Sequence, residues 1–160
     1  MQLIRFCQFF SQRRVTGFTL IELLVTISIV AVLAAIAAPS FRDFVAGQRI
    51  KTASYEISYA LTNARSEALK RNANVVMAPN GGGWQNGWNV TAGTLVVDRH
   101  EAFSGLTVSG PAASLTYNNS GRLTNAVMPF AISSSAGATA APRCVSITLT
   151  GMPKSKAGAC

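Results

Sequence analysis

The sequence predicts an α+β fold in which one long N-terminal helix packs against a small antiparallel β-sheet domain. Three observations predict it. Residues 18–38 carry one charged side chain and are long enough to cross a membrane as a helix. After them, apolar residues recur at helical spacing as far as Arg71. From Asn74 onward this period ends, and short β-branched runs alternate with Gly, Asn, Ser and Pro.

Composition agrees with an anchored β domain. Of 160 residues, 49% are hydrophobic and 12% are charged, about half the charged fraction of roughly 25% in average globular proteins. The net charge is +8. Without Arg5, Arg13 and Arg14, which precede the apolar run, 11 basic and 6 acidic side chains leave +5. Such an excess fits polyanion binding and also fits an ordinary soluble surface.

The apolar segment 18–38 fits three kinds of N-terminal signal. As a helix it spans about 31 Å, the thickness of a bilayer core. Arg13 and Arg14 precede it and stay cytoplasmic, so the rest of the chain is exported. A secretory signal cut near "AAIAAP" and a twin-arginine signal are two interpretations. Neither explains Glu22, because an acidic residue within a membrane costs roughly 2.5–3.5 kcal/mol.

The third interpretation rests on the stretch Gly17-Phe18-Thr19-Leu20-Ile21-Glu22. It resembles the signal of prepilin peptidase, which implies cleavage after Gly17, N-methylation of Phe18 and a glutamate fifth in the mature chain. Pro39 resembles the helix-kinking proline of type IV pilins. The resemblance implies four parts, which are a removed leader, a transmembrane and filament-core helix, an amphipathic helix half and a β domain. Their expected ranges are 1–17, 18–38, 39–72 and 73–160.

This resemblance also suggests a role for Glu22. Cleavage after Gly17 leaves a charged amino group on Phe18 at the membrane edge. In a filament of parallel helices, Glu22 of an incoming subunit would pair with the Phe18 amine of its neighbour. Removing one member of such a pair in a low dielectric costs several kcal/mol. Glu22 is therefore expected to favour registered assembly.

The second half of the helix is expected to bury one face. Apolar residues follow each other at gaps of mostly three and four. They are Phe41, Phe44, Val45, Ile50, Ala53, Ile57, Leu61, Ala64 and Ala68. For Phe41 and Phe44, anchoring at the membrane boundary is the alternative.

Six segments after the helix are predicted as strands, folded as two small antiparallel sheets over it. They are 74–79, 87–98, 106–110, 114–118, 127–133 and 143–150. Together with the N-terminal signal, the stretches Gly87–Asp98, Leu115–Ile132 and Arg143–Gly151 resemble the GspH/FimT family of minor pilins and pseudopilins.

The cysteines predict a disulfide near the C-terminus. Once a leader containing Cys7 is removed, Cys144 and Cys160 remain as an even pair. Their bond would close a loop of about 15 residues, worth about 3 kcal/mol. Two reduced thiols are the alternative for a cytoplasmic domain. With no Cys-x-x-Cys pair and only His100, no metal site is expected.

No catalytic constellation is present, so we expect no enzyme, no cofactor and no small-molecule substrate. The run Asp98-Arg99-His100-Glu101 is interpreted as a polar loop after a strand. Gly81-Gly82-Gly83 lacks the lysine of a phosphate loop. We expect Trp88 to begin a strand and pack on the helix, and Trp84 to cover a loop.

Basic residues near the C-terminus raise the question of DNA binding. Arg143, Lys154 and Lys156 lie near or inside the loop that the cysteines would close, and Arg122 lies in a turn. Some FimT-type minor pilins bind DNA through a C-terminal Gly-Arg-x-Arg motif. Here the corresponding stretch, Gly151–Lys156, keeps the glycine and has lysines instead. Lysine lacks arginine's planar fork, so any binding would be weak and salt-sensitive. A solvated basic loop is the alternative.

The expected function is therefore assembly. The chain is predicted to be a minor pilin, processed by prepilin peptidase, that joins major and minor pilins in a tip or initiation complex. It would support pilus biogenesis, and through it twitching, adhesion or DNA uptake. It would reside in the bacterial inner membrane with its C-terminal domain in the periplasm, and then in the fibre. A type II secretion pseudopilin and a DNA-binding minor pilin for natural transformation are the alternatives.

Overall fold

The computed structural model describes residues 17–135 and 139–160. The chain divides between Ala38 and Pro39 into two compact units. Helix α1, Leu20–Arg71, contains Pro39 within it, and the kink predicted there stays a prediction. The helix ends where Asn72 adopts φ 50. The Asn72 N–H donates to the Leu69 carbonyl at 3.3 Å, and the Ala73 N–H donates to the Ala68 carbonyl at 3.2 Å. These two bonds form a Schellman cap.

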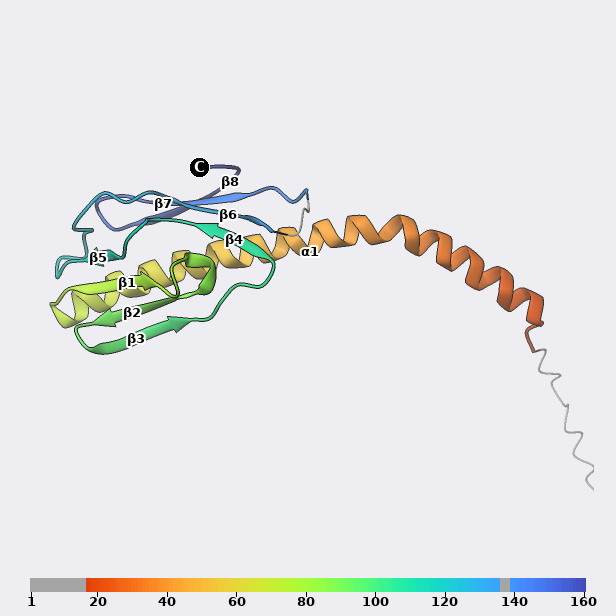
Figure 1. Ribbon diagram of the computed structural model, residues 1–160, viewed down its shortest axis with the longest axis horizontal. Helices are drawn as coiled ribbons and strands as arrows, with labels where there is room; N and C mark the ends of the chain where they lie inside the picture. Colours follow the sequence, from red (N-terminus) through yellow and green to blue (C-terminus); the bar gives the residue numbers. More distant parts are fainter. Residues whose placement is uncertain (1–16, 136–138) are drawn as a thin grey trace, which may run out of the picture. The chain divides into compact units, whose positions relative to one another are not determined.

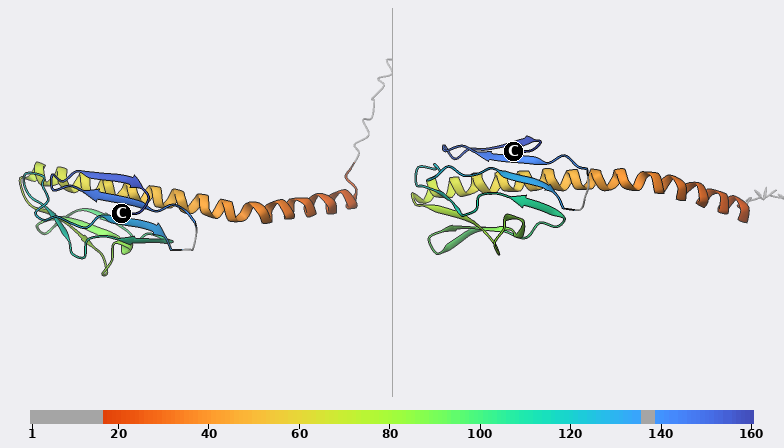
Figure 2. Two further views of the ribbon diagram at one scale, coloured as in Figure 1. Left: turned by 90° about the horizontal axis from the view of Figure 1, so that it is seen from above. Right: turned by 45° about the horizontal axis from the view of Figure 1, so that its top comes forward.

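In the part of the chain that the structure describes, eight strands and one short 3-10 helix follow α1, and every strand pairing is antiparallel. One sheet has the order β3-β2-β1-β5 and the other β4-β6-β7-β8. Both lie along the second half of α1 (Figures 1 and 2). The predicted fold class is thus confirmed. The bounds are β1 Val75–Pro79, η1 Trp84–Asn86, β2 Trp88–Ala92, β3 Leu95–His100, β4 Leu106–Ser109, β5 Leu115–Tyr117, β6 Phe130–Ser134, β7 Arg143–Ile147 and β8 Pro153–Ala157.

The core of the second unit is formed by one face of α1 and the inner faces of both sheets. The predicted helix face is confirmed from Ile50 to Ala68. Phe41 and Phe44 do not belong to it, since they are 66% and 61% exposed. The prediction of one continuous apolar face was therefore wrong at its start. Anchoring at a membrane boundary stays a prediction for both rings.

Three local predictions were wrong. The segment 87–98 is not one strand, because it turns at Gly93, which has φ 60, to form the β2–β3 hairpin. The run Asp98–His100 is the end of β3 and not a loop. Strand β8 was missed, since Pro, Lys, Ser and Ala have low strand propensity. Pairing with β7 over five residue pairs determines its conformation.

The two tryptophans are both core residues. Trp88 begins β2 and is buried, as expected. Trp84 was expected to cover a loop, but it is only 3% exposed. Its indole N–H donates to the Pro111 carbonyl at 2.8 Å, and its ring meets Phe130 edge-on at 4.8 Å. A buried indole with a satisfied donor stabilises the packing between loop and sheet.

Candidate functional site

The start of α1 holds the residues predicted for processing and assembly. Gly17 and Phe18 are exposed and precede the helix. Thr19 occupies the N-cap position and Glu22 the third helical position. The Glu22 carboxylate accepts hydrogen bonds from the Thr19 N–H at 2.8 Å and from its hydroxyl at 3.0 Å. In return, the Thr19 hydroxyl accepts from the Glu22 N–H at 3.2 Å.

This reciprocal arrangement is a capping box, which satisfies backbone N–H groups that have no partner inside the helix. Sequence reasoning assigned Glu22 an intermolecular role and overlooked the local one. The sequence pattern Thr-x-x-Glu before an apolar run predicts such a capping box.

The first half of α1 is long and apolar enough to cross a membrane. None of its most apolar window is buried inside the described protein. Burying a Leu, Ile or Val side chain is worth about 1.5–3 kcal/mol. In water, this half of the helix would therefore leave a large apolar surface exposed.

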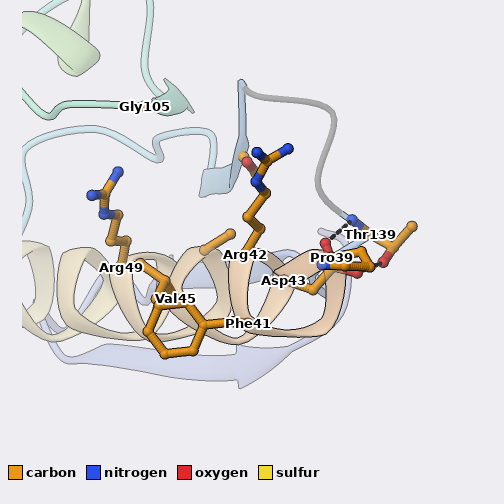
Figure 3. A pocket seen from close by; sticks show the side chains of 10 residues that line it. Pro39, Phe41, Arg42, Asp43, Val45, Arg49, Gly105 and Thr139 are labelled. Atoms are coloured by element: carbon orange, nitrogen blue, oxygen red, sulfur yellow. Dashed lines mark hydrogen bonds between the residues drawn. The ribbon is translucent and has the colours of Figure 1, made fainter. Parts of the chain in front are cut away.

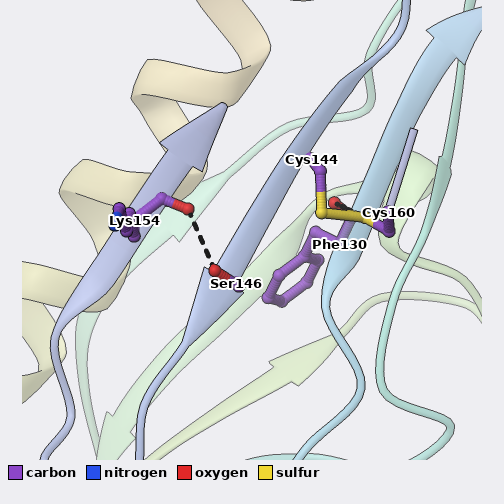
Figure 4. The surroundings of a disulfide bond; sticks show 5 residues. All are labelled: Phe130, Cys144, Ser146, Lys154 and Cys160. Carbon is purple, nitrogen blue, oxygen red and sulfur yellow. Dashed lines mark hydrogen bonds between the residues drawn. A yellow bond between two sulfur atoms is a disulfide. The ribbon is translucent and has the colours of Figure 1, made fainter. Parts of the chain in front are cut away.

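The predicted C-terminal basic residues lie on the β7–β8 hairpin, but on two different faces of it. Lys156 pairs with Cys144, and Lys154 with Ser146. Because directly opposed residues point to the same side of a sheet, both lysines share the Cys144 face. Both are exposed. Figure 4 shows Lys154 beside Ser146 near the cysteine pair.

Arg143 belongs to the opposite face. Its guanidinium carbon lies 5.9 Å from the centre of the Tyr55 ring on α1. Its Nη2 donates to Ser155 at 3.3 Å, while its buried Nε has no partner among the described residues. The structure thus does not unite Arg143 with Lys154 and Lys156 in one basic cluster.

Arg122 is exposed in the turn between β5 and Leu123. The Arg122 N–H donates to the Asn118 side chain at 3.0 Å. This turn lies beside the turn between β7 and β8, because the Leu123 N–H donates to the Leu149 carbonyl at 3.2 Å. Arg122 is therefore positioned near the far end of the hairpin from Arg143.

The predicted disulfide between Cys144 and Cys160 is confirmed, with the two Cα atoms 5.1 Å apart (Figure 4). Cys144 is buried although it is on the outer face of its sheet, because the end of the chain covers it. The Gly158 N–H donates to the Pro142 carbonyl at 2.8 Å. These contacts hold the C-terminal residues against β7.

A hollow lies at the start of the second unit, between α1 and the ends of β4 and β6 (Figure 3). Asp43 joins its two sides by accepting a hydrogen bond from the Thr139 N–H at 3.1 Å. Arg42 and Arg49 also line it. Ser134 and Thr139 supply the hydroxyl groups of its lining, and within residues 17–135 and 139–160 no group of His, Cys, Asp and Glu is suited to hold a metal.

Two family models match this chain. The model "Type II transport protein GspH" covers residues 54–151, and "Prokaryotic N-terminal methylation motif" covers residues 12–38. Two fimbrial proteins of Pseudomonas aeruginosa are each 43% identical over 54 residues. This match spans 34% of the chain and 35% of each relative, so the chain matches about a third of their length.

Crystal structures of the type IV minor pilin FimU of Pseudomonas aeruginosa share the fold. One superposes with a TM-score of 0.59 at 24% identity, covering 68% of this chain and 89% of FimU. A second crystal form gives a TM-score of 0.56 at 25% identity, covering 66% and 91%. The fold resemblance and the two family models agree, and the chain belongs to the GspH family of pilin-like proteins.

Proposed function

We propose that this protein is a minor pilin that is made as a prepilin and assembles with other pilins at the start or tip of a type IV pilus. One observation carries the proposal. A methylation motif at residues 12–38 includes the uncovered apolar first half of α1, and the second half of this helix is buried in a GspH-type β domain. This combination suits a subunit stored in a membrane and then packed among other helices.

Processing would expose the assembly end of the helix. Prepilin peptidase would cut the exposed bond between Gly17 and Phe18, and Phe18 would then be N-methylated. Arg13 and Arg14 would stay cytoplasmic, which places the β domain in the periplasm. Glu22 would exchange its capping bonds with Thr19 for a contact with the Phe18 amine of a neighbouring subunit.

The first test is the N-terminus of the mature protein. Mass spectrometry of the protein recovered from membranes or fibres is expected to find a chain beginning with N-methylated Phe18. A mature chain that begins at Pro39 or Ser40 would show an ordinary secretory signal, and the assembly proposal would be abandoned.

The second test separates the charge of Glu22 from its capping role. In Glu22→Gln the side chain still accepts from Thr19, since glutamine also completes a capping box, but the negative charge is gone. We expect this variant to insert in the membrane and its amount in sheared fibres to fall at least tenfold, because a low-dielectric ion pair is worth several kcal/mol.

Thr19→Ala is the matched control. It loses the N-cap at a cost of about 1 kcal/mol and keeps the charge of Glu22. We expect it to enter fibres at close to the normal level. Equal incorporation of Glu22→Gln and the unchanged protein would refute the role of the charge.

Within the same class, a minor pseudopilin of a type II secretion system is the alternative, and the match to the type II transport protein GspH family favours it. The fold of FimU favours the pilus. Deleting the chain and measuring both surface fibres and secreted proteins separates the two. Loss of fibres with normal secretion supports the pilus, and the reverse result supports the secretion system.

DNA binding is the second candidate function, favoured by two exposed lysines that share one face of an edge strand. Two phosphate contacts give weak binding with a shallow salt dependence. Full-length protein in detergent would be titrated with duplex DNA at two salt concentrations. Lys154→Ala/Lys156→Ala should abolish binding, and Lys51→Ala/Lys70→Ala, which changes two exposed lysines of α1, should not. No binding at low salt removes this candidate.

A further inference from the structure

The hollow between α1 and the ends of β4 and β6 has a volume of about 540 Å³ and lies wholly within the second unit. Its helix side is lined by Arg42, Val45, Ala46 and Arg49. Because these positions are three, four and seven residues apart, they share one face of the helix. Figure 3 shows the two arginine side chains extending from the same side of α1. The hollow therefore combines two guanidinium groups with an apolar surface between them.

Neither arginine has an acidic partner in the described protein. Glu67 shows how α1 pairs its cations elsewhere, since it binds Lys70 at 3.4 Å and Arg71 at 2.6 Å, three and four residues further on. No acidic residue stands three or four positions from Arg42 or Arg49. Within residues 17–135 and 139–160, neither arginine forms an ion pair. Two positive charges at the hollow are therefore without a bound anion.

The carboxylate of the lining belongs to Asp43, and its hydrogen bonds go to Thr139. One oxygen accepts from the Thr139 N–H at 3.1 Å and the other from the Thr139 hydroxyl. Figure 3 shows this contact at the edge of the hollow, on the side away from Arg49. Asp43 therefore fastens the wall of the hollow and leaves both guanidinium groups to another anion.

The opposite wall positions Arg49. Its Nη1 lies 3.2 Å from the point that a Cβ on Gly105 would occupy, so the guanidinium packs on this glycine. The Gly105 carbonyl accepts from the Ser135 N–H at 3.2 Å, which joins the ends of β4 and β6 behind it. A side chain at position 105 would displace the guanidinium. The backbone of the sheet thus holds Arg49 at the hollow.

A helix that crosses a bilayer with residues 18–38 brings the hollow to the bilayer surface. Arg42 is the fourth residue after Ala38, so it lies about 6 Å further along α1. This distance equals the depth of one headgroup layer, roughly 5–7 Å. Arg49 is about 10.5 Å beyond Arg42, and helical side chains lean toward the N-terminus, which is the membrane side. Both arginines can therefore reach a lipid headgroup.

The charge of this flank also needs a reason. Lysine and arginine are in excess on the cytoplasmic flank of a membrane helix and not on the exported one. In the proposed orientation, Arg42 and Arg49 are on the exported flank. Their retention there, on one face and without acidic partners, favours a binding role over a topological one.

We propose that the hollow binds the phosphate of an anionic membrane lipid of the phosphatidylglycerol type. Arg42 and Arg49 donate to its oxygens, since the planar guanidinium matches a phosphate with two parallel hydrogen bonds. Val45 and Ala46, between the arginines, contact the glycerol carbons next to the phosphate. A zwitterionic lipid binds less well, because its ammonium group is repelled by the second arginine.

The inference rests on the proposed function in one respect, which is the storage of the subunit in a membrane. It adds a task for the hollow before assembly. A lipid held at the start of the second unit fixes the height of the β domain above the bilayer. The subunit gives up this lipid when it leaves the membrane for a fibre.

The test is native mass spectrometry of the full-length protein in mild detergent, titrated with phosphatidylglycerol or phosphatidylcholine. We expect one phosphatidylglycerol to bind at least tenfold more tightly than phosphatidylcholine. Arg42→Gln/Arg49→Gln should lose this preference. Lys70→Gln/Arg99→Gln removes two exposed basic residues outside the hollow and is the control with the same net charge, so it should keep the preference. Equal losses in the two variants would overturn the inference.

A second variant distinguishes a built site from general attraction between a basic protein and an anionic lipid. Arg42→Lys/Arg49→Lys keeps both charges and removes the planar forks. It should bind phosphatidylglycerol at least fivefold more weakly than the unchanged protein. Unchanged affinity would show attraction by charge alone and would overturn the site.

Inorganic phosphate distinguishes a lipid from a free anion. In large excess it should leave the bound lipid in place, because it makes no contact with the apolar surface between the arginines. Displacement of the lipid would assign the hollow to soluble phosphate and overturn the lipid proposal.

Recovery of the protein from membranes and fibres separates this inference from the proposed function. If the protein enters both normally and shows no lipid preference, the inference is wrong and the pilin function stands. If it is recovered from neither, the proposed function is wrong and the inference falls with it.

Discussion

Gly151 occupies a tight turn between β7 and β8. Its φ is +81, a conformation that other residues adopt at a cost of roughly 1–2 kcal/mol. A Cβ at this position would also collide with the Gly121 carbonyl and with the Tyr117 ring. The Tyr117 hydroxyl donates to the Gly151 carbonyl at 3.2 Å. Gly151 thus lets two neighbouring turns come into contact.

We expect Gly151→Ala to lower the free energy of unfolding by more than 2 kcal/mol, measured by urea denaturation followed through tryptophan fluorescence. Gly93→Ala is the control, because its φ is +60 and no atom lies within 4 Å of the added Cβ. It should cost only about 1–2 kcal/mol. Equal costs at the two positions would contradict the role given to the Gly121 contact.

Burial raises the pKa of Tyr117 from its ordinary value of 10.0 to about 12, although the charge of Arg65 acts in the opposite direction. A group with a raised pKa in the folded state contributes full stability below its unfolded pKa. We therefore expect unfolding stability to be unaffected by this group below pH 10 and to fall between pH 10 and 12. Urea midpoints across this range measure it.

Tyr117→Phe should flatten that alkaline fall, at the cost of the hydrogen bond to Gly151. A variant that shows the same slope as the unchanged protein would assign the fall to other groups.

At the level of elements, local pattern was informative for the helix and less so for the last strand. Glycine spacing, β-branched runs and the 3-4 apolar period predicted α1 and most strands. Strand β8 was missed because its residues favour no strand by themselves, and its backbone is ordered by partners on β7. The disulfide was foreseen by counting cysteines, yet the face on which it lies depends on the β7–β8 register.

Removing the disulfide with Cys144→Ser/Cys160→Ser should lower the free energy of unfolding by about 3 kcal/mol, the chain-entropy value for a loop of this length. The measurement is urea denaturation of this variant against the oxidised protein. The oxidised protein treated with reductant is the control and should lose a similar amount. A variant as stable as the oxidised protein would show that the hairpin holds without its cross-link.

On the scale of the whole molecule, the two units differ in how far their apolar residues are buried. Every residue of the hydrophobic core lies between Ile50 and Ile147, in the second unit. The apolar residues of the first unit are exposed in the described structure. Folding of the β domain therefore depends on its own half of α1, while the other half is suited to lipid or neighbouring helices.

A chain that begins at Pro39 is therefore expected to fold alone. It should be soluble, unfold cooperatively on heating in circular dichroism, and keep the near-ultraviolet signal of its packed tryptophans. A chain beginning at Ile57 would lose Ile50 and Ala53 from the core and is expected to unfold at a lower temperature. A non-cooperative transition in the Pro39 chain would contradict an independent core.

Sequence alone was sufficient for the α+β class, the methylation motif and the cysteine pair, because each depends on neighbouring residues or on composition. Arg143 lies on the opposite face of the β7–β8 hairpin from Lys154 and Lys156 because of the strand register. This register pairs residues that are distant in the chain. The contact between Glu56 of α1 and His100 of β3 joins residues 44 positions apart. A sequence pattern is local, whereas such a contact exists only once the sheet has packed on the helix.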